Sequence, residues 1–327
     1  EWYDFPNFDF PGLSVDKPSY SPGETVIIWV SALNINPYPV VDGAIRAHIV
    51  YMDGDEEYIL DEFYLTEGIS LLPDEHISVE SNWQLPENAK AGTYRVAVHF
   101  ISADSFNLGG VSFLRGIYGE MTSFQVVGGT DLLHFDTAKL MINAELQPLH
   151  ELARPFLEGT SVEISVPIKN EGAATEVEIT YELYSWDDLK GEDLLEEYGK
   201  QESISLAPGA SKMLTYDLPS TMTSDAYLLK VIATSPKNNA ILKVRIPILG
   251  RAIKLNFAGL DSFPLKKGEP ATVFLCVSNP AEPGTALVLE DDEEPSSPIQ
   301  DASLRLSIEA GGETIFQDLS DGLEIGG

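Results

Sequence analysis

Acidic side chains at alternate positions are the first feature of this chain that could do chemistry. The stretch MDGDEE places Asp53, Asp55 and Glu57 two residues apart, as at the start of an EF-hand calcium loop. Such a loop needs glycine at its sixth position and glutamate at its twelfth, where this chain has Tyr58 and Tyr64. The sequence therefore favours a tight hairpin turn with solvated acids, and Ca²⁺ bound by these three carboxylates is the weaker alternative.

Catalytic and zinc-binding patterns are absent from the sequence. The stretch HELAR begins at His150 and resembles the H-E-x-x-H zinc pattern, but Arg154 stands where the second histidine is required. The sequence contains no G-x-S-x-G, Walker-type or G-x-G-x-x-G motif. With 52 acidic residues, carboxylate pairs such as Asp187 and Asp188 are expected from composition alone. We therefore expect a protein that is not an enzyme and that has no catalytic residues and no cofactor.

Composition limits the classes of partner. The 327 residues include 52 acidic and 20 basic ones, which gives a net charge of −32. Nucleic acids and anionic membranes need clustered Lys and Arg, so neither is an expected partner. One cysteine, Cys276, rules out an intrachain disulfide. No apolar run reaches the roughly 18–20 residues needed to span a bilayer, so no direct membrane insertion is expected.

The elements that must position any site are almost all strands. Apolar and polar residues alternate in many segments, and Pro and Gly separate them; examples are TVIIWVSALN, AIRAHIVYM, TYRVAVHFIS, SVEISVPIKN and EVEITYELYS. No segment has a sustained 3.6-residue apolar stripe of helical length. The stretch TAKLMINAEL, residues 137–146, is interpreted as a first strand.

One pattern of turn and strand residues occurs three times along the chain. Each copy begins with a turn glycine and a strand that ends at an asparagine, and a hairpin follows; the residues are Gly23, Gly159 and Gly268, then Asn34 or Asn36, Asn170 and Asn279. Tyr94 and Tyr227 occupy matching places later in the first two copies. The pattern predicts an all-β protein of tandem immunoglobulin-like β-sandwiches. The predicted domains are 1–128, 129–249 and 250–327, the third incomplete at its C-terminus and carrying an acidic insert at 281–300.

Two stretches carry a resemblance to known families. The pair ISLAPGASKMLTYDLP and AYLLKVIATS resembles CARDB-type, cell-adhesion-related repeats of bacterial and archaeal surface proteins, and DKPSYSPGETVIIWV resembles the start of a macroglobulin (MG2) sandwich. The resemblance implies an extracellular module of a prokaryotic cell surface. A macroglobulin-like protease trap ranks lower, because the thioester motif Cys-Gly-x-x-Gln is missing from the sequence.

Two segments stand apart from the repeat as candidate interaction surfaces. The N-terminal EWYDFPNFDFPG crowds aromatic residues, and either packs on its own sandwich or adds to a neighbouring subunit. The insert at 103–120 replaces a short turn of the second copy, and packs against the second domain or contacts a partner. The candidate interaction residues are Trp2, Tyr3, Phe5, Phe106, Leu108, Phe113, Leu114, Arg115 and Tyr118.

These observations predict a non-enzymatic structural or adhesive protein, such as a filament, S-layer or stalk component. Its expected partners are other subunits, further copies of itself, or a cell-surface protein or glycan. The alternative is a ligand- or partner-binding ectodomain of a membrane-anchored complex that recognises its target through the insert at 103–120.

Overall fold

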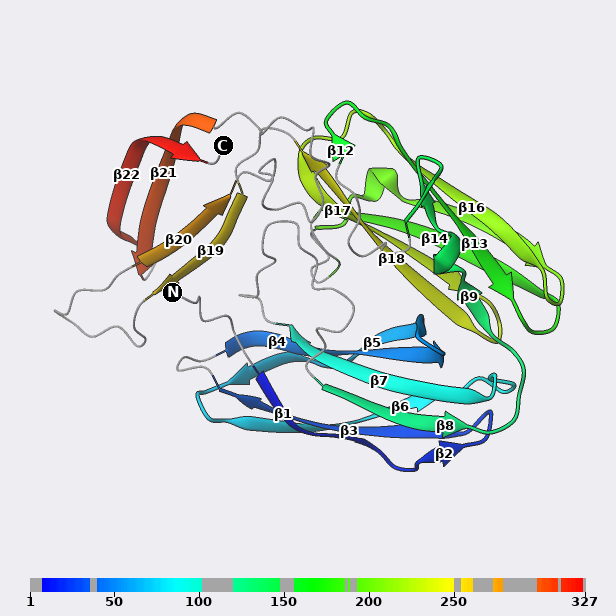
Figure 1. Ribbon diagram of the computed structural model, residues 1–327. Coiled ribbons are helices and arrows are strands. Elements are labelled where there is room, and N and C mark those ends of the chain that lie inside the picture. The colour runs from blue at the N-terminus through cyan, green and yellow to red at the C-terminus, as the bar shows by residue number, and fades with distance from the viewer. Residues whose placement is uncertain are drawn as a thin grey trace.

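The computed structural model describes residues 8–35, 40–101, 120–147, 156–185, 188, 193–249, 254–260, 273–278, 299–310 and 313–325. Side chains are described between residues 10 and 248. Strands dominate these residues (Figure 1), and the remaining helical elements are short 3₁₀ turns, η1 (Thr137–Lys139) and η4 (Glu196–Tyr198).

The first sandwich is formed by two layers of strands. One layer has the order β1-β3-β6, with β1 (Phe8–Val15), β3 (Thr25–Asn34) and β6 (His76–Gln84). The other has the order β5-β4-β7-β8-β2, with β5 (Glu56–Leu71), β4 (Val40–Asp53), β7 (Gly92–Ile101), β8 (Glu120–Val126) and β2 (Ser19–Tyr20). Neighbouring strands are antiparallel except β2, which runs parallel to β8.

Alternation of apolar residues builds the core between these layers. In β3, Val26, Ile28 and Val30 point inward and are almost fully buried. They join Ile49 of β4 and Val96 of β7 in one apolar cluster. Full burial of each such side chain contributes about 1.5–3 kcal/mol, so the period-two pattern fixes which face of each strand lies inside.

The second sandwich repeats the arrangement. Its first layer contains β13 (Val162–Asn170) between β16 (Ser211–Leu218) and the short strands β9 (Leu133–Phe135), β10 (Met141–Ile142) and β11 (Glu145–Leu146). Its second layer has the order β15-β14-β17-β18-β12, with β15 (Lys200–Leu206), β14 (Thr175–Ser185), β17 (Asp225–Thr234), β18 (Asn239–Leu249) and β12 (Phe156–Leu157).

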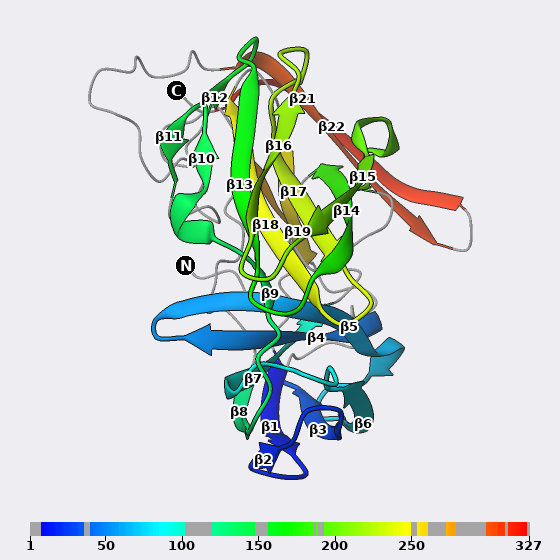
Figure 2. The same ribbon diagram turned by 90° about the vertical axis from the view of Figure 1, so that its right-hand side faces the viewer.

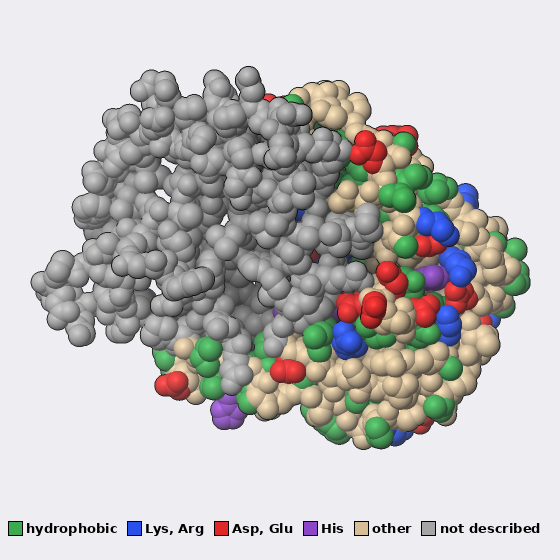
Figure 3. Space-filling view, viewed as in Figure 1, with side chains coloured by type: hydrophobic (Ala, Val, Ile, Leu, Met, Phe, Trp, Pro, Cys, Tyr) green, Lys and Arg blue, Asp and Glu red, His purple; other side chains and the backbone are tan. Residues whose placement is uncertain are grey.

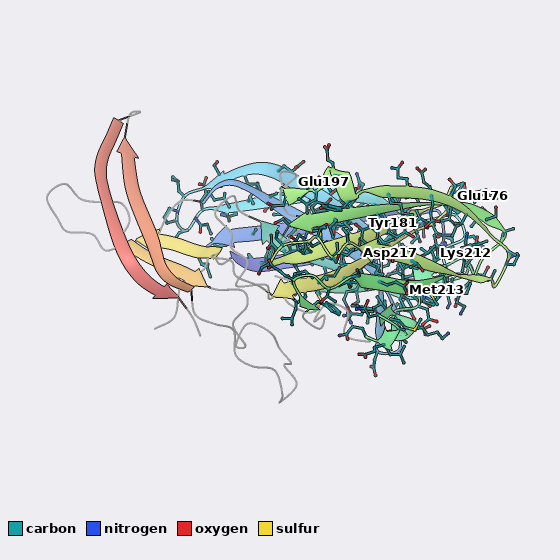
Figure 4. All side chains as sticks on the ribbon, turned by 90° about the horizontal axis from the view of Figure 1, so that it is seen from above. Glu176, Tyr181, Glu197, Lys212, Met213 and Asp217 are labelled. Carbon is teal, nitrogen blue, oxygen red and sulfur yellow. The ribbon has the colours of Figure 1, made fainter. Side chains whose placement is uncertain are left out.

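Strand β16 illustrates how the second core is filled. Leu214 and Tyr216 are buried between the layers, whereas Lys212, Met213 and Asp217 are exposed (Figure 4). The buried set packs with alternate residues of β13, β14, β17 and β18 in one apolar cluster.

Two side-chain hydrogen bonds recur in both sandwiches. The Tyr94 hydroxyl donates to the backbone oxygen of Lys90 at 3.0 Å, and the Tyr227 hydroxyl donates to that of Thr223 at 3.0 Å. A tyrosine that reaches back in this way at the start of the penultimate strand is the tyrosine corner of immunoglobulin-like domains. The all-β, immunoglobulin-like fold predicted from the sequence is therefore confirmed.

The asparagines that end β3 and β13 also have a defined role. The Asn34 amide donates to the backbone oxygen of Leu71 at 3.1 Å, and the Asn170 amide donates to that of Leu206 at 3.4 Å. Both asparagines are almost fully buried. Each one connects the end of its own strand to the turn that leads into the next strand of the same sheet.

Residues beyond 249 contribute two antiparallel strand pairs. Strand β19 (Lys254–Leu260) pairs with β20 (Val273–Ser278), and β21 (Ile299–Ala310) pairs with β22 (Glu313–Ile325). The first sandwich has the same kind of pairing, between β1 and β3 and between β4 and β5. The domain boundaries and the incompleteness of the third copy stay predictions.

The single strand expected over residues 137–146 is wrong. The segment forms η1 and then the two-residue strands β10 and β11. Asn143 and Ala144, between these strands, have φ values of +50° and +64°. Two successive left-handed residues reverse the chain, so a continuous strand cannot form there.

The two sandwiches are joined through their larger sheets. Ile241 of β18 pairs with Ile59 of β5, and this pair merges the two layers into a ten-stranded sheet. Figures 1 and 2 show the second sandwich standing on β4 and β5 of the first. The surface between the two sandwiches is therefore where residues from distant parts of the chain meet.

Candidate functional site

The calcium candidates lie in the hairpin between β4 and β5. Asp53 ends β4, and Gly54 and Asp55 form a two-residue turn in which Gly54 has a φ of +64°. Asp53 and Asp55 are exposed, and the Glu57 carboxylate pairs with Arg95 at 3.0 Å. Within the described ranges, no three His, Cys, Asp or Glu side chains are grouped as metal ligands. These three acids are thus arranged as a hairpin turn, and the calcium assignment stays a prediction.

The predicted interaction residues lie outside the described residues. They are Trp2, Tyr3, Phe5, Phe106, Leu108, Phe113, Leu114, Arg115 and Tyr118. The acidic insert at 281–300 lies mostly outside them as well. The strands that flank the insert at 103–120 are described: β7 ends at Ile101, β8 begins at Glu120, and the matching turn of the second sandwich runs only from Thr234 to Asn239.

A different group of polar residues meets between the two sandwiches. On β4, Ile45, Ala47 and Ile49 fill the first core, so Arg46 and His48 project from the opposite face of the sheet. This outer face should be solvated in an isolated sandwich, yet Arg46 and His48 are each only 5% exposed. The second sandwich covers them.

Strands β17 and β18 supply the facing residues by the same alternation. Leu229 and Val231 fill the second core, and Lys230 between them projects outward. Lys243 of β18 lies directly opposite Lys230 in the antiparallel register. We call the resulting group the junction cluster; its members are Arg46, His48, Glu62, Asp188, Lys230 and Lys243.

Glu62 of β5 is the first of two carboxylates at the centre of the cluster. Its oxygens lie 2.8 Å from Lys230 Nζ, 2.6 Å from Lys243 Nζ and 3.5 Å from the Arg46 guanidinium. His48 Nε2 lies 2.5 Å from the same carboxylate. The Glu62 side chain is 8% exposed, so these partners take the place of water.

Asp188, in the connection after β14, is the second carboxylate. Its oxygens lie 2.7 Å from Lys243 Nζ, 3.1 Å from Lys230 Nζ and 3.1 Å from the Arg46 guanidinium. Each of the three cations therefore contacts both carboxylates. Glu62 belongs to the first sandwich and Asp188 to the second, so every cation bridges the two sandwiches.

Burial and charge set the protonation of the carboxylates. Burial raises the pKa of Glu62, but the charge of Lys243 and the hydrogen bond from His48 outweigh it and hold that pKa well below 4.5. Burial likewise raises the pKa of Asp188, and the charges of Lys243 and Arg46 lower it further than burial raises it. Both carboxylates are ionised at neutral pH.

The pKa values of Lys230 and His48 shift in opposite directions. Burial lowers the pKa of Lys230, but Glu62 and Asp188 outweigh burial and raise it. Burial lowers the pKa of His48 to about 4, against the hydrogen bond with Glu62. At neutral pH the imidazole is thus neutral, and its Nε2–H donates to Glu62. Arg46 Nε donates to His99 Nε2 at 3.1 Å, and burial holds the pKa of His99 well below 6.5.

These protonation states decide what the junction cluster can do. Among the members of the junction cluster, three cations face two carboxylates, so these five groups together carry one excess positive charge. A general acid or base works best with a pKa near the operating pH, and the pKa values of Glu62, Asp188 and Lys230 are all shifted away from neutrality. The arrangement is suited to holding two surfaces together rather than to transferring protons.

The connection between the sandwiches adds a second set of contacts. Lys90 of the first sandwich pairs with Glu171 of the second at 2.6 Å, and Lys169 pairs with the same carboxylate at 2.6 Å. Burial raises the pKa of Glu171, but hydrogen bonds from the two lysines lower it to about 2. The ring of Tyr58 packs edge-on against that of His134 at 4.4 Å.

Glycine is required in this connection. Gly129 has a φ of +82°, and a Cβ atom there would lie 2.0 Å from the backbone oxygen of Ala89. The close approach lets the Lys90 N–H donate to the backbone oxygen of Asp131 at 3.0 Å. The backbone of the connection is therefore fixed against the first sandwich.

Sequence reasoning missed the junction cluster. Arg46, His48, Lys230 and Lys243 occupy the polar positions of alternating strands, which is the pattern of a solvated face. Asp188 belongs to an acidic pair that was attributed to composition alone. One feature of the sequence could have indicated the cluster: charged residues and a histidine lie in the middle of long strands, away from the turns.

Comparisons with known proteins add little to this description. No protein-family model matches the sequence, and no curated protein matches it. The chain is similar to the solved structure of trypsin-activated alpha-2-macroglobulin from Escherichia coli, with 12% identity and a TM-score of 0.33 over 98% of this chain and 21% of that one.

Two further solved structures cover a smaller part of the chain. The alkylpurine DNA glycosylase AlkC of Pseudomonas fluorescens matches with 14% identity and a TM-score of 0.29, over 37% of this chain and 30% of that one. The beta-glucosidase of Listeria innocua matches with 13% identity and a TM-score of 0.25, over 38% of this chain and 16% of that one. Likenesses of this size carry no functional argument, and the chain spans less than a third of each protein.

In the part of the chain that the structure describes, no helix is both long enough and apolar enough to cross a bilayer.

Proposed function

We propose that this chain is part of a non-enzymatic, extracellular structural or adhesive protein of a prokaryotic cell surface, such as a filament, S-layer or stalk. The observation that carries the proposal is the junction between the two sandwiches. Tandem domains of one chain are by default mobile unless their interface is large or strongly held. Here a shared sheet and a buried ionic cluster join the two domains, as suits a protein that must keep its shape while it spans or bears load.

Charge and sequence resemblance support the same proposal. A net charge of −32 keeps a surface protein soluble and is screened over about 8–10 Å at ordinary ionic strength. On the face seen in Figure 3, acidic and basic side chains of the described residues are interspersed. The resemblance to CARDB-type repeats suggests further subunits, a surface protein or a glycan as partners, and nucleic acids do not fit the charge.

The alternative function is a binding ectodomain of a membrane-anchored complex. The observation that favours it is the connection between β7 and β8. It takes 18 residues, 102–119, where the second sandwich needs only the four residues 235–238. Extra length at one turn of a repeated fold is typical of a recognition loop.

Two measurements test these proposals. Immunogold labelling of intact cells of the source organism should decorate the surface, and labelling only after permeabilisation would contradict both. Electron microscopy and sedimentation velocity of the purified chain, at rising concentration, should then show ordered polymers or lateral assemblies if the structural role is correct.

A matched variant separates the two functions. Replacing residues 102–119 by the four-residue turn Ser-Pro-Lys-Asn changes no residue of the strands that the structure describes. A structural protein should still assemble, whereas an ectodomain should stay monomeric in both forms and lose retention of its partner from the cell envelope. A chain that stays monomeric with the original loop contradicts the structural role.

A further inference from the structure

We propose that the junction cluster makes the two sandwiches unfold as a single cooperative unit, and that its two carboxylates, not its lysines, are the members it cannot lose. The inference concerns folding and domain coupling, and it does not depend on the proposed function. It follows from three observations. Strands β5 and β18 pair at only one residue pair, both sandwiches supply members of the cluster, and its cations outnumber its carboxylates.

The backbone alone joins the sandwiches weakly. The register of β5 against β18 consists of one residue pair, Ile59 with Ile241. By comparison, β17 pairs with β18 over ten residue pairs within the second sandwich. A single strand-to-strand pair does not by itself fix the angle between two domains. The connection at 129–132, which is hydrogen-bonded to both sandwiches, and the side chains of the junction cluster must do so.

The cluster draws its members from both sandwiches. Arg46, His48 and Glu62 belong to the first, and Lys230, Lys243 and Asp188 to the second. Three of the ion pairs cross from one sandwich to the other: Arg46 with Asp188, and Lys230 and Lys243 with Glu62. Separating the sandwiches leaves the second with two lysines facing one aspartate, so unfolding of either sandwich removes partners from the other.

Because of the charge imbalance, loss of a carboxylate should destabilise the junction more than loss of a lysine. Removal of one lysine leaves two cations facing two carboxylates, which is a neutral buried group. Removal of one carboxylate leaves three cations facing a single carboxylate, and the uncompensated charge cannot be solvated at the junction. A methionine in place of Lys230 also preserves the apolar stem that packs along the sheet.

The test follows unfolding of the full chain separately in each sandwich. Hydrogen exchange of β3 reports the first sandwich and exchange of β13 reports the second, as temperature or urea is raised. In the wild type both strands should lose protection together. In Glu62→Gln, the two transitions should separate, and the lower one should fall by roughly 10 °C.

Three further variants complete the design. Lys230→Met should keep one shared transition within about 3 °C of the wild type. Glu24→Gln breaks the exposed pair between Lys17 and Glu24 and is the matched control, with no expected change. If Glu62→Gln fails to fold, the double variant Glu62→Gln/Lys230→Met restores the net charge of the cluster to +1 and should refold with a shared transition.

Either of two results would overturn the proposal. One is separate unfolding of β3 and β13 in the wild type. The other is an equal effect of Glu62→Gln and Lys230→Met on coupling, because the cluster would then be indifferent to the sign of the charge removed.

Discussion

The larger sheets of the two sandwiches have the same strand order, but their outer faces carry different side chains at matching positions. Aligning the corner tyrosines, Tyr94 and Tyr227, places Lys230 at the position of Ala97, three residues after the tyrosine in each strand. Their cross-strand partners are Lys243 in the second sandwich and Met121 in the first. The same positions thus carry two lysines in one copy and two apolar residues in the other.

At the neighbouring positions the difference is reversed, and the first sandwich carries the charged residue. Arg46 pairs across the strands with His99, and the matching pair in the second sandwich is Thr180 with Ile232. Inside the sandwiches, by contrast, the corner tyrosines and the buried asparagines are shared. The difference teaches that a repeated sandwich keeps what its own core needs, whereas the outer face is set by the neighbour that covers it.

Acidification should distinguish the two outer faces most strongly. In the unfolded chain the pKa of a histidine is about 6.5, whereas in the folded chain burial lowers that of His48 to about 4. Below pH 6.5 the unfolded state therefore binds more protons, and the free energy of unfolding falls as the pH decreases towards 4, by up to about 3 kcal/mol. Burial is the main cause of this shift; Glu62 raises the pKa of His48, Lys243 and Arg46 lower it, and the ring of His99 packs beside the imidazole.

Urea unfolding midpoints between pH 7 and pH 4.5 measure this slope. His48→Gln should reduce the slope, since glutamine keeps a donor for Glu62 and does not titrate, and His99, whose pKa burial also lowers, should keep the rest. His76→Gln, at an exposed position of β6, is the control and should leave the profile unchanged. Parallel profiles for wild type and His48→Gln would show that His48 is not buried against the second sandwich.

The buried asparagines should be equivalent in the two copies. Asn34→Ala and Asn170→Ala each remove an amide that donates to backbone oxygens at a strand end, and leave those oxygens unpaired. We expect each change to lower the free energy of unfolding by about 2 kcal/mol, measured by chemical denaturation. A loss in only one copy would mean that the two sandwiches do not share this anchor.

The smallest expected effect concerns two matching turns, the one between β5 and β6 and the one between β15 and β16. Asp74 of the first sandwich has a φ of +62°, and Gly209 at the matching place of the second has +69°. Left-handed backbone is unfavourable for residues other than glycine. Asp74→Gly should therefore raise the free energy of unfolding by about 0.5 kcal/mol, and Gly209→Asp should lower it by a similar amount, by the same denaturation assay.

The strands and the core were predictable because they depend on local patterns. Period-two alternation in β3, β4 and β13 determines which side chains share a face, and turn glycines such as Gly54 mark where hairpins reverse. The irregular entry to the second sandwich was not predictable in this way. Asn143 and Ala144 adopt left-handed conformations that their residue types do not require.

The sequence by itself determined that this protein is an array of immunoglobulin-like sandwiches, because burial of every second residue is a property of each strand. Only the tertiary structure decided that Arg46, His48, Glu62, Asp188, Lys230 and Lys243 form one buried cluster. Alternation assigns residues to a face, but whether water or another sheet covers that face depends on contacts between segments that lie more than a hundred residues apart.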